Sequence, residues 1–133
     1  MSALYDKGRQ KFLEGSIQWL SHNIRVCLVD STYVPDLAVD EFLSVIPGGS
    51  IVATTGNLAS KTSVAGVADA ADVTLTAISG PTVYYAVVYR DTGSAATSPL
   101  IALIDSGTGL PMTPNGGDIV IRWAEDTNKI FKL

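Results

Sequence analysis

Two short motifs in the second half of the chain carry side chains that could do acid–base chemistry. Asp91-Thr92-Gly93 and Asp105-Ser106-Gly107 each follow an apolar run that is typical of a β-strand. Aspartic proteases carry Asp-Thr-Gly or Asp-Ser-Gly at the ends of strands, where two carboxylates share one proton and activate a water molecule. These residues therefore raise the hypothesis of an aspartic protease that uses Asp91 or Asp105.

The surroundings of the two motifs argue against a protease. The aspartates are only 14 positions apart, whereas in two-lobed proteases each motif belongs to its own lobe. Single-motif proteases that act as dimers need a later apolar pair followed by glycine, and residues 119–123 read IVIRW without one. Asp, Thr, Ser and Gly are also ordinary turn formers. We therefore expect both motifs to be turns of a sheet, and we expect no catalytic residues.

The other reactive side chains form no second constellation. His22 is the only histidine and no Gly-x-Ser-x-Gly elbow accompanies it, which favours a solvated turn position. Cys27 stands alone in an apolar run, so we expect a buried, inert thiol. One cysteine and one histidine cannot supply four zinc ligands, and the aspartates lack the spacing of a calcium loop. We expect no metal and no cofactor.

Four aromatic residues, Tyr84, Tyr85, Tyr89 and Trp123, could stack on a sugar ring if they were exposed. On alternating strands, however, Tyr85, Tyr89 and Trp123 share their faces with valine and isoleucine residues. This pattern favours core packing and cross-strand pairing. A carbohydrate-binding platform stays the alternative.

Composition narrows the class of protein further. The 133 residues fit one domain, with 47% apolar and only 17% charged side chains. Such a surface favours an oligomer or a docked partner. The net charge is −4 and the nine basic residues are scattered, so direct nucleic acid binding is not expected. No apolar run is long enough for a transmembrane helix, and no signal peptide is expected.

The elements that would position these residues are mostly short strands. Residues 83–90, 100–105 and 118–123 predict three neighbouring strands around which the rest is arranged. Residues 24–30 predict a strand that is buried on both faces except at Arg25. Further expected strands span residues 50–55, 58–62 and 72–78, with a hairpin turn at 56–57 and a loop at 63–71. Residues 129–133 are expected to form a short last strand or a tail. One short helix is expected at 36–46.

The N-terminus predicts a helix over residues 2–14, capped by Ser2 and ended by Gly15. Leu4, Gly8 and Phe12 recur at a spacing of four on one helical face, flanked by Tyr5 and Leu13. A helix this short is marginal alone and must dock on something. Two alternatives stay open: packing on its own sheet, or an arm that docks on a neighbouring subunit.

Together these patterns predict a mainly β fold, an antiparallel β-sandwich or jelly-roll-like domain with a short N-terminal helix. Residues 1–133 form a single domain in this prediction, and residues 1–15 form a helical N-terminal arm. No internal repeat and no second domain are evident.

Read end to end, the chain resembles a family of small bacteriophage virion proteins. The opening ALYDKGRQKFLEG, followed by Ile17 and Trp19, is similar to the family's start, and IRVCLVD at 24–30 is similar to its first core strand. The other similar segments are LASKT, DAADVT, RDTGSAATSPLIALID, GLPMTPNGGDI and NKIFKL. The resemblance spans nearly the whole chain, with weaker matches at 31–50 and 63–67.

The resemblance implies a non-enzymatic structural component of a phage particle, assembled in the host cytoplasm. A capsid decoration, or cement, protein on the outside of an icosahedral shell is the first expectation, and a tail or fibre component that binds a receptor or carbohydrate is the alternative. The expected partners are the major capsid protein and copies of the chain itself, as a trimer or dimer, with no membrane. The candidate docking residues are Leu4, Tyr5, Gly8, Phe12, Leu13, Phe131 and Leu133.

Overall fold

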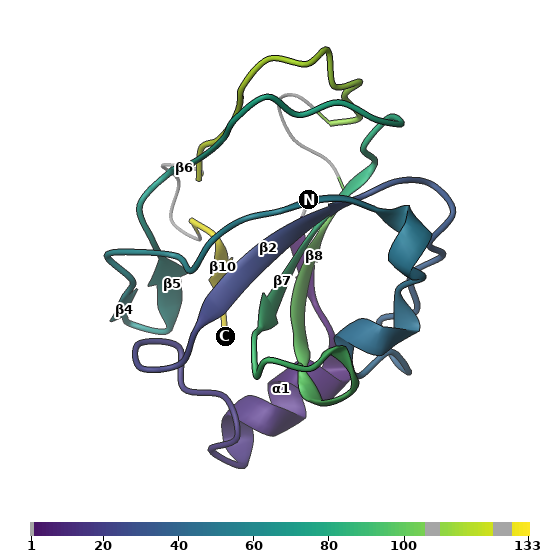
Figure 1. Cartoon of the computed structure of the whole chain (residues 1–133). Helices are drawn as coiled ribbons and strands as arrows, with labels where there is room; N and C mark the ends of the chain where they lie inside the picture. The colour runs from purple at the N-terminus through teal and green to yellow at the C-terminus, as the bar shows by residue number, and fades with distance from the viewer. Residues whose placement is uncertain (1, 106–109, 124–128) are drawn as a thin grey trace.

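The computed structural model describes residues 2–105, 110–123 and 129–133 (Figure 1). The fold is mainly β with one short helix, α1 (Asp6–Leu13). The strands are β1 (Ser2–Leu4), β2 (Ile24–Val29), β3 (Ile51–Thr54), β4 (Thr62–Val64), β5 (Val67–Asp69), β6 (Val73–Leu75), β7 (Tyr85–Arg90), β8 (Leu100–Ile104), β9 (Ile119–Ile121) and β10 (Phe131–Lys132). Three 3₁₀ turns span Leu43–Val45, Gly48–Ser50 and Ala95–Thr97.

The central sheet has five antiparallel strands in the order β1-β8-β7-β2-β3. In the middle of this sheet, β2 pairs with β7 without a register shift, from Ile24 opposite Arg90 to Val29 opposite Tyr85. Both faces of β2 are buried and Arg25 is partly exposed. The expectation of a doubly buried strand at 24–30 is therefore confirmed, because a continuous apolar run suits a strand that is covered on both faces.

Two small sheets cover one face of the central sheet and make the arrangement sandwich-like. Their strand orders are β10-β5-β4 and β6-β9, and all their pairings are antiparallel. The core between the layers includes Trp19, Trp123 and Phe131, with the rings of Trp19 and Phe131 meeting edge to face at 5.3 Å. Figure 1 shows β4, β5 and β10 to one side of β2, β7 and β8.

Residues 31–46, here called the covering segment, lie over the opposite face of the central sheet. Tyr33 and Ile46 are buried there, and Leu37 and Leu43 are partly buried. They pack on sheet residues that include Cys27, Val29, Val87, Tyr89 and Leu100. Successive side chains of β2 point to opposite faces of the sheet and thus pack in two separate cores, one under the small sheets and one under the covering segment.

The helix expected at 36–46 is wrong. Residues 37–39 form a turn, Leu43–Val45 forms a 3₁₀ turn, and most of the remaining residues of that range are irregular. The Asp36 carboxylate accepts from the backbone N–H of Ala38 at 3.1 Å, and the Asp40 carboxylate accepts from the N–H of Asp36 at 3.0 Å. Aspartate side chains that bind nearby backbone groups in this way stabilise turns in competition with a helix.

The hairpin expected at 56–57 is also wrong. β3 pairs with β2, and residues 58–61 are not a strand. The hairpin lies instead at β4–β5, inside the stretch interpreted as a loop. Its two-residue turn places Ala65 at φ 50° and Gly66 at φ 82°, which is the left-handed pair that suits a tight hairpin. The sequence did not indicate β4 and β5, because their small residues show little alternation of apolar and polar side chains.

The three runs between residues 83 and 123 are strands, but only two of them are neighbours. β7 and β8 pair directly, whereas β9 pairs with β6 in a separate sheet, with Val73 opposite Ile121. The turn-rich connection after β8 carries the chain into the other layer, and an isolated bridge joins Val83 to Met112. The expected group of three neighbouring strands is therefore corrected: β7 and β8 are neighbours in the central sheet, and β9 belongs to a small sheet.

The N-terminal helix is shorter than expected. Residues 2–4 form β1, which pairs with β8 with Leu4 opposite Ala102. The helix begins at Asp6, and Tyr5 rather than Ser2 is its N-cap residue. Gly15 follows the helix at φ 77°, as expected of a glycine after a helix end. Residues 2–4 satisfy their backbone N–H and C=O groups by pairing with β8 at the edge of the sheet, instead of forming a further helical turn.

Candidate functional site

Four of the five N-terminal docking residues pack within the chain's own fold, and Leu13 is the exception. Leu4 and Tyr5 are buried in the two cores, and Phe12 is half-buried against Phe131 with ring centroids 5.9 Å apart. Gly8 faces β8, where a Cβ at position 8 would lie 2.6 Å from the Leu100 carbonyl oxygen. The close approach anticipated for Gly8 is therefore made to the chain's own sheet, which is the first of the two alternatives for this helix.

The C-terminal docking residues divide between the core and the surface. Phe131 is buried against Trp19, and the backbone N–H of Leu133 donates to the Gly66 carbonyl at 2.9 Å. The side chain of Leu133 is 58% exposed, and that of Leu13 is 87% exposed. Of the predicted docking set, only these two present large apolar side chains to the outside.

The two aspartate motifs do not come together. Asp91 follows Arg90 at the end of β7, and Asp105 follows Ile104, which pairs with Ala86 near the start of β7. The hairpin therefore holds the two carboxylates roughly 20 Å apart, since a strand rises about 3.4 Å per residue. A shared proton needs carboxylates in direct contact. Residues 106–109 of the second motif lie outside the described residues.

Asp91 has two structural partners. Its carboxylate accepts from the backbone N–H of Gly93 at 2.9 Å, which is the turn interaction expected of an Asp-x-Gly sequence, and Gly93 is at φ 92°. The same carboxylate forms an ion pair with the Arg25 Nε at 3.0 Å. The first motif is thus a turn, as expected.

Cys27 occupies the expected buried position, whereas His22 lies in a turn as expected but is half-buried rather than solvated. His22 is half-buried in a turn, and its Nδ1 accepts from the Gln18 backbone N–H at 2.9 Å. Cys27 is fully buried, and burial raises the pKa of its thiol to about 12. A thiol with so high a pKa is not ionised at neutral pH and is a poor nucleophile.

The aromatic residues do not build a stacking platform. Tyr89 and Trp123 are buried, and the Trp123 Nε1 donates to the Ala71 carbonyl at 3.1 Å. Tyr85 is half-buried with its ring edge to face with Tyr33 at 6.2 Å. Tyr84 is 40% exposed. Sugar stacking needs several exposed ring faces on one surface, and these four residues offer one.

A buried hydrogen-bond chain fastens the covering segment to the N-terminus. The Tyr33 hydroxyl donates to the Asp40 carboxylate at 2.7 Å, so the Tyr5 hydroxyl donates to Tyr33 across 2.9 Å. Burial raises the pKa of both tyrosines above the usual value, which keeps them protonated. The backbone N–H of Asp6 also donates to the Leu37 carbonyl at 2.8 Å. No local pattern in the sequence signals this pairing, because its members are 28 positions apart.

The outer side of the covering segment exposes two large apolar side chains among polar ones. Val34 is 82% exposed and Val39 is 66% exposed, although both flank residues that are fixed by the tyrosine chain. Exposed apolar side chains are common when they are single, but here they project from one short segment whose backbone is held in place. Sequence inspection did not single out these two valines; a helix was expected over residues 36–46, a range that includes only Val39.

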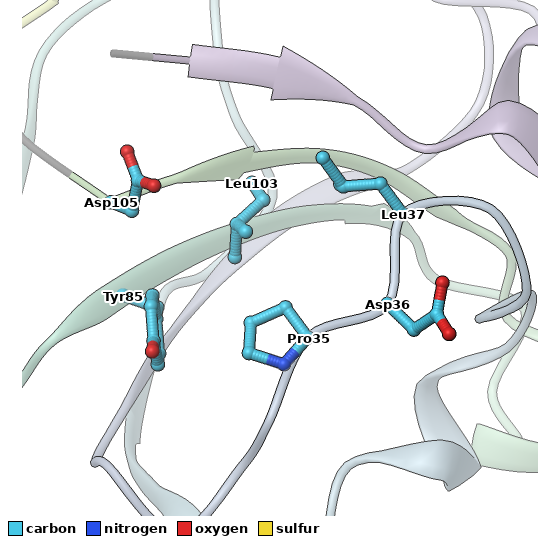
Figure 2. Close-up of a pocket in the computed structure, with 6 residues that line it drawn as sticks. All are labelled: Pro35, Asp36, Leu37, Tyr85, Leu103 and Asp105. Atoms are coloured by element: carbon cyan, nitrogen blue, oxygen red, sulfur yellow. The ribbon is translucent and has the colours of Figure 1, made fainter.

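Next to these valines the structure has an open hollow of about 410 Å³ (Figure 2). Figure 2 shows Pro35 and Leu37 of the covering segment beside Tyr85 and Leu103 of the central sheet, with Asp36 and Asp105 at opposite ends. The hollow is lined by Pro35, Asp36, Leu37, Tyr85, Leu103 and Asp105. Its mixed apolar and acidic lining suits contact with another protein surface better than a reaction. We therefore take the covering segment with its hollow as the candidate functional site.

Comparisons with known proteins add no relative: no family model matches the chain, and no curated protein matches it. Within residues 2–105, 110–123 and 129–133, no three His, Cys, Asp or Glu side chains gather in a way that could hold a metal ion. The same residues contain no helix with the length and apolarity needed to span a membrane.

Proposed function

We propose that this chain is a structural protein of a bacteriophage particle, most specifically a decoration protein that binds the outer face of an icosahedral capsid and stabilises the shell. The observation that carries the proposal is the sequence resemblance, which extends over nearly the whole chain. Its partners in this proposal are the major capsid protein and further copies of the chain, as a trimer or dimer. A tail or fibre component is the alternative location in the particle.

The way the chain is held together supports a structural role. β1 completes one edge of the central sheet, and β10 is an edge strand of a small sheet. The ring contacts of Phe131 with Phe12 and Trp19 join the C-terminal strand to the N-terminal region. A domain whose first and last strands are both packed resists local unfolding at its ends. This resistance suits a protein that must reinforce an assembly.

The surface that we propose for docking differs from the N-terminal arm. Most of the predicted docking residues pack inside the fold, namely Leu4, Tyr5, Gly8 and Phe131. Contact with the capsid must therefore be made by side chains that are exposed. Val34 and Val39 on the covering segment are the best placed, with Leu13 and Leu133 as the exposed remainder of the predicted set. Burying a valine contributes about 1.5 kcal/mol or more, and many copies on one shell make such weak contacts sufficient.

The test is binding of purified chain to shells assembled without it. The double variant Val34→Ser, Val39→Ser should bind more than about tenfold more weakly, because two apolar contacts are lost. The matched control is Val64→Ser, Val120→Ser, which changes two exposed valines on the small sheets. Equal binding by the test variant and the wild type, or no binding of the wild type to shells, would refute this docking surface.

A further inference from the structure

The side chains of Lys61 and Arg90 both bind the short connection that contains His22. Arg90, the last residue of β7, donates from Nη1 to the Ser16 carbonyl at 2.9 Å. The Lys61 Nζ donates to the His22 carbonyl. Both acceptors belong to residues 16–22, the connection between α1 and β2, and His22, Lys61 and Arg90 are all half-buried. Three positively charged or N–H-bearing groups therefore border the same connection.

No carboxylate neutralises this group within the part of the chain that the structure describes. Arg9, Lys11, Arg25 and Lys129 each form an ion pair with an Asp or Glu, whereas the partners of Lys61 and Arg90 are backbone carbonyls. Glu14, the acid nearest to residues 16–22 along the chain, accepts from the Gln10 side chain at 3.1 Å. Among the described residues, Lys61 and Arg90 are thus bound by neutral carbonyls and by no carboxylate.

The strand register explains why Asp91 does not neutralise Arg90. Arg90 lies opposite Ile24, and Arg25 lies opposite Tyr89. Residues that pair directly share a face, and successive residues alternate. Asp91 consequently lies on the face of Arg25, with which it pairs at 3.0 Å, and Arg90 lies on the other face.

Two donors in the group remain unused by the described residues. The Arg90 Nε is buried and has no hydrogen-bond partner among them. The His22 Nδ1 accepts from a backbone N–H, so in the neutral imidazole the proton is on Nε2, which is a donor. A buried donor without a partner calls for an explanation, and a bound ion is one of the usual ones.

We propose that His22, Lys61 and Arg90 form a binding site for a single oxyanion, the group shared by carboxylates and phosphates. The guanidinium suits such oxygens by geometry, the ammonium by charge, and the imidazole adds an N–H. The net charge of −4 disfavours a polyanion and leaves a single anionic group as the ligand. This site lies outside the covering segment, and it does not depend on the proposed role in a phage particle.

The histidine provides the reporter. Burial lowers the pKa of His22, and the charges of Arg90 and Lys61 lower it further; burial also lowers the pKa of Lys61. An anion between these groups favours the charged imidazole and must raise the pKa of His22. The full chain is therefore titrated with inorganic phosphate in one arm and acetate in the other, while NMR follows the His22 ring and the Arg90 Nε–H.

We expect saturable shifts of both signals and a higher pKa of His22 in at least one arm. Lys61→Gln should weaken the binding about tenfold or more, which is the size expected for one hydrogen bond to a charged group. Lys132→Gln, a change of an exposed lysine, should bind as the wild type does. Saturation with phosphate alone assigns the site to phosphate, and saturation with acetate assigns it to a carboxylate. Shifts that are linear with concentration in both arms, or equal affinity in Lys61→Gln, would overturn the proposal.

Discussion

Gly8 of α1 touches the backbone of β8 so closely that a Cβ at position 8 would lie 2.6 Å from the Leu100 carbonyl oxygen. Real Cβ atoms do not approach a carbonyl oxygen this closely, and a backbone atom of β8, which is paired with β1 on one side and β7 on the other, cannot move aside cheaply. The contact fixes the helix against the sheet at the point where the chain passes from β1 into α1. It also explains why a residue with poor helix propensity stands in the middle of the helix.

Gly8→Ala should lower the free energy of unfolding by about 1–3 kcal/mol, the usual cost of overpacking, despite the gain of about 1 kcal/mol in helix propensity. The matched control is Gly49→Ala, where a Cβ would meet nothing within 4 Å. Urea denaturation of both variants checks the prediction. A Gly8→Ala variant as stable as the wild type would show that the helix can shift away from β8.

Deletion of residues 1–14 should abolish cooperative folding. The deletion removes β1 from the sheet edge and takes Leu4, Tyr5 and the half-buried Phe12 out of the cores. Each such loss costs about 2–5 kcal/mol, and the sum reaches the whole stability of a typical domain.

Near-ultraviolet circular dichroism and a thermal melt of the shortened chain measure this effect. Leu13→Ser is the control, because it changes an exposed residue of the same segment and should fold normally. If the shortened chain melts cooperatively at the wild-type temperature, then the N-terminal segment is a dispensable arm after all.

Stability should fall at alkaline pH because of Cys27. Burial raises the pKa of its thiol from 9.0 to about 12 in the folded chain. Between these values the unfolded chain has lost the proton that the folded chain still holds, so the free energy of unfolding falls by up to about 1.4 kcal/mol per pH unit. Below pH 9 this contribution is fully present.

The comparison is between the wild type and Cys27→Ala, with urea denaturation at intervals from pH 8 to pH 11. The alanine variant starts from a lower stability, but its decline with pH should be shallower, since it lacks the buried thiol and the thiolate charge that adds to burial in raising the pKa of Tyr5 and Tyr89. Parallel curves would mean that the thiol ionises in the folded state.

Ala65→Asn should stabilise the β4–β5 hairpin. Ala65 is at φ 50° in the two-residue turn, a left-handed conformation that asparagine tolerates better than alanine. We expect a gain of about 0.5–1 kcal/mol in the free energy of unfolding. Ala95→Asn, at an exposed position without a positive φ, serves as the control and should give no gain. A loss of stability at position 65 would contradict the assigned turn.

The parts of the fold that sequence reasoning predicted are those with strong local patterns. The unbroken apolar run of β2 identified a strand buried on both faces, and the Asp-Thr-Gly sequence identified the turn at Asp91. The buried thiol of Cys27 was predicted from the same apolar run. In each case the deciding residues are adjacent or nearly adjacent in the chain.

The parts that it missed depend on distant partners. Nothing near β9 indicates that it pairs with β6 rather than with β8, and the hydrogen bond between Tyr5 and Tyr33 joins two stretches that look unrelated. Residues 36–46 of the covering segment resembled a helix because Asp36 could cap one and apolar residues that include Leu37 and Leu43 could face inward. The candidate docking surface was expected at the chain ends, where most of the apolar residues are packed in the fold and only Leu13 and Leu133 are exposed.

The role in a phage particle is tested most directly by the copy number and position of this chain in an assembled virion. Quantitative mass spectrometry gives the ratio of this chain to the major capsid protein, and cryo-electron microscopy gives its location. We predict many copies on the outer face of the shell, with the covering segment toward the capsid. A few copies at one vertex, or absence from the purified particle, would contradict a decoration protein.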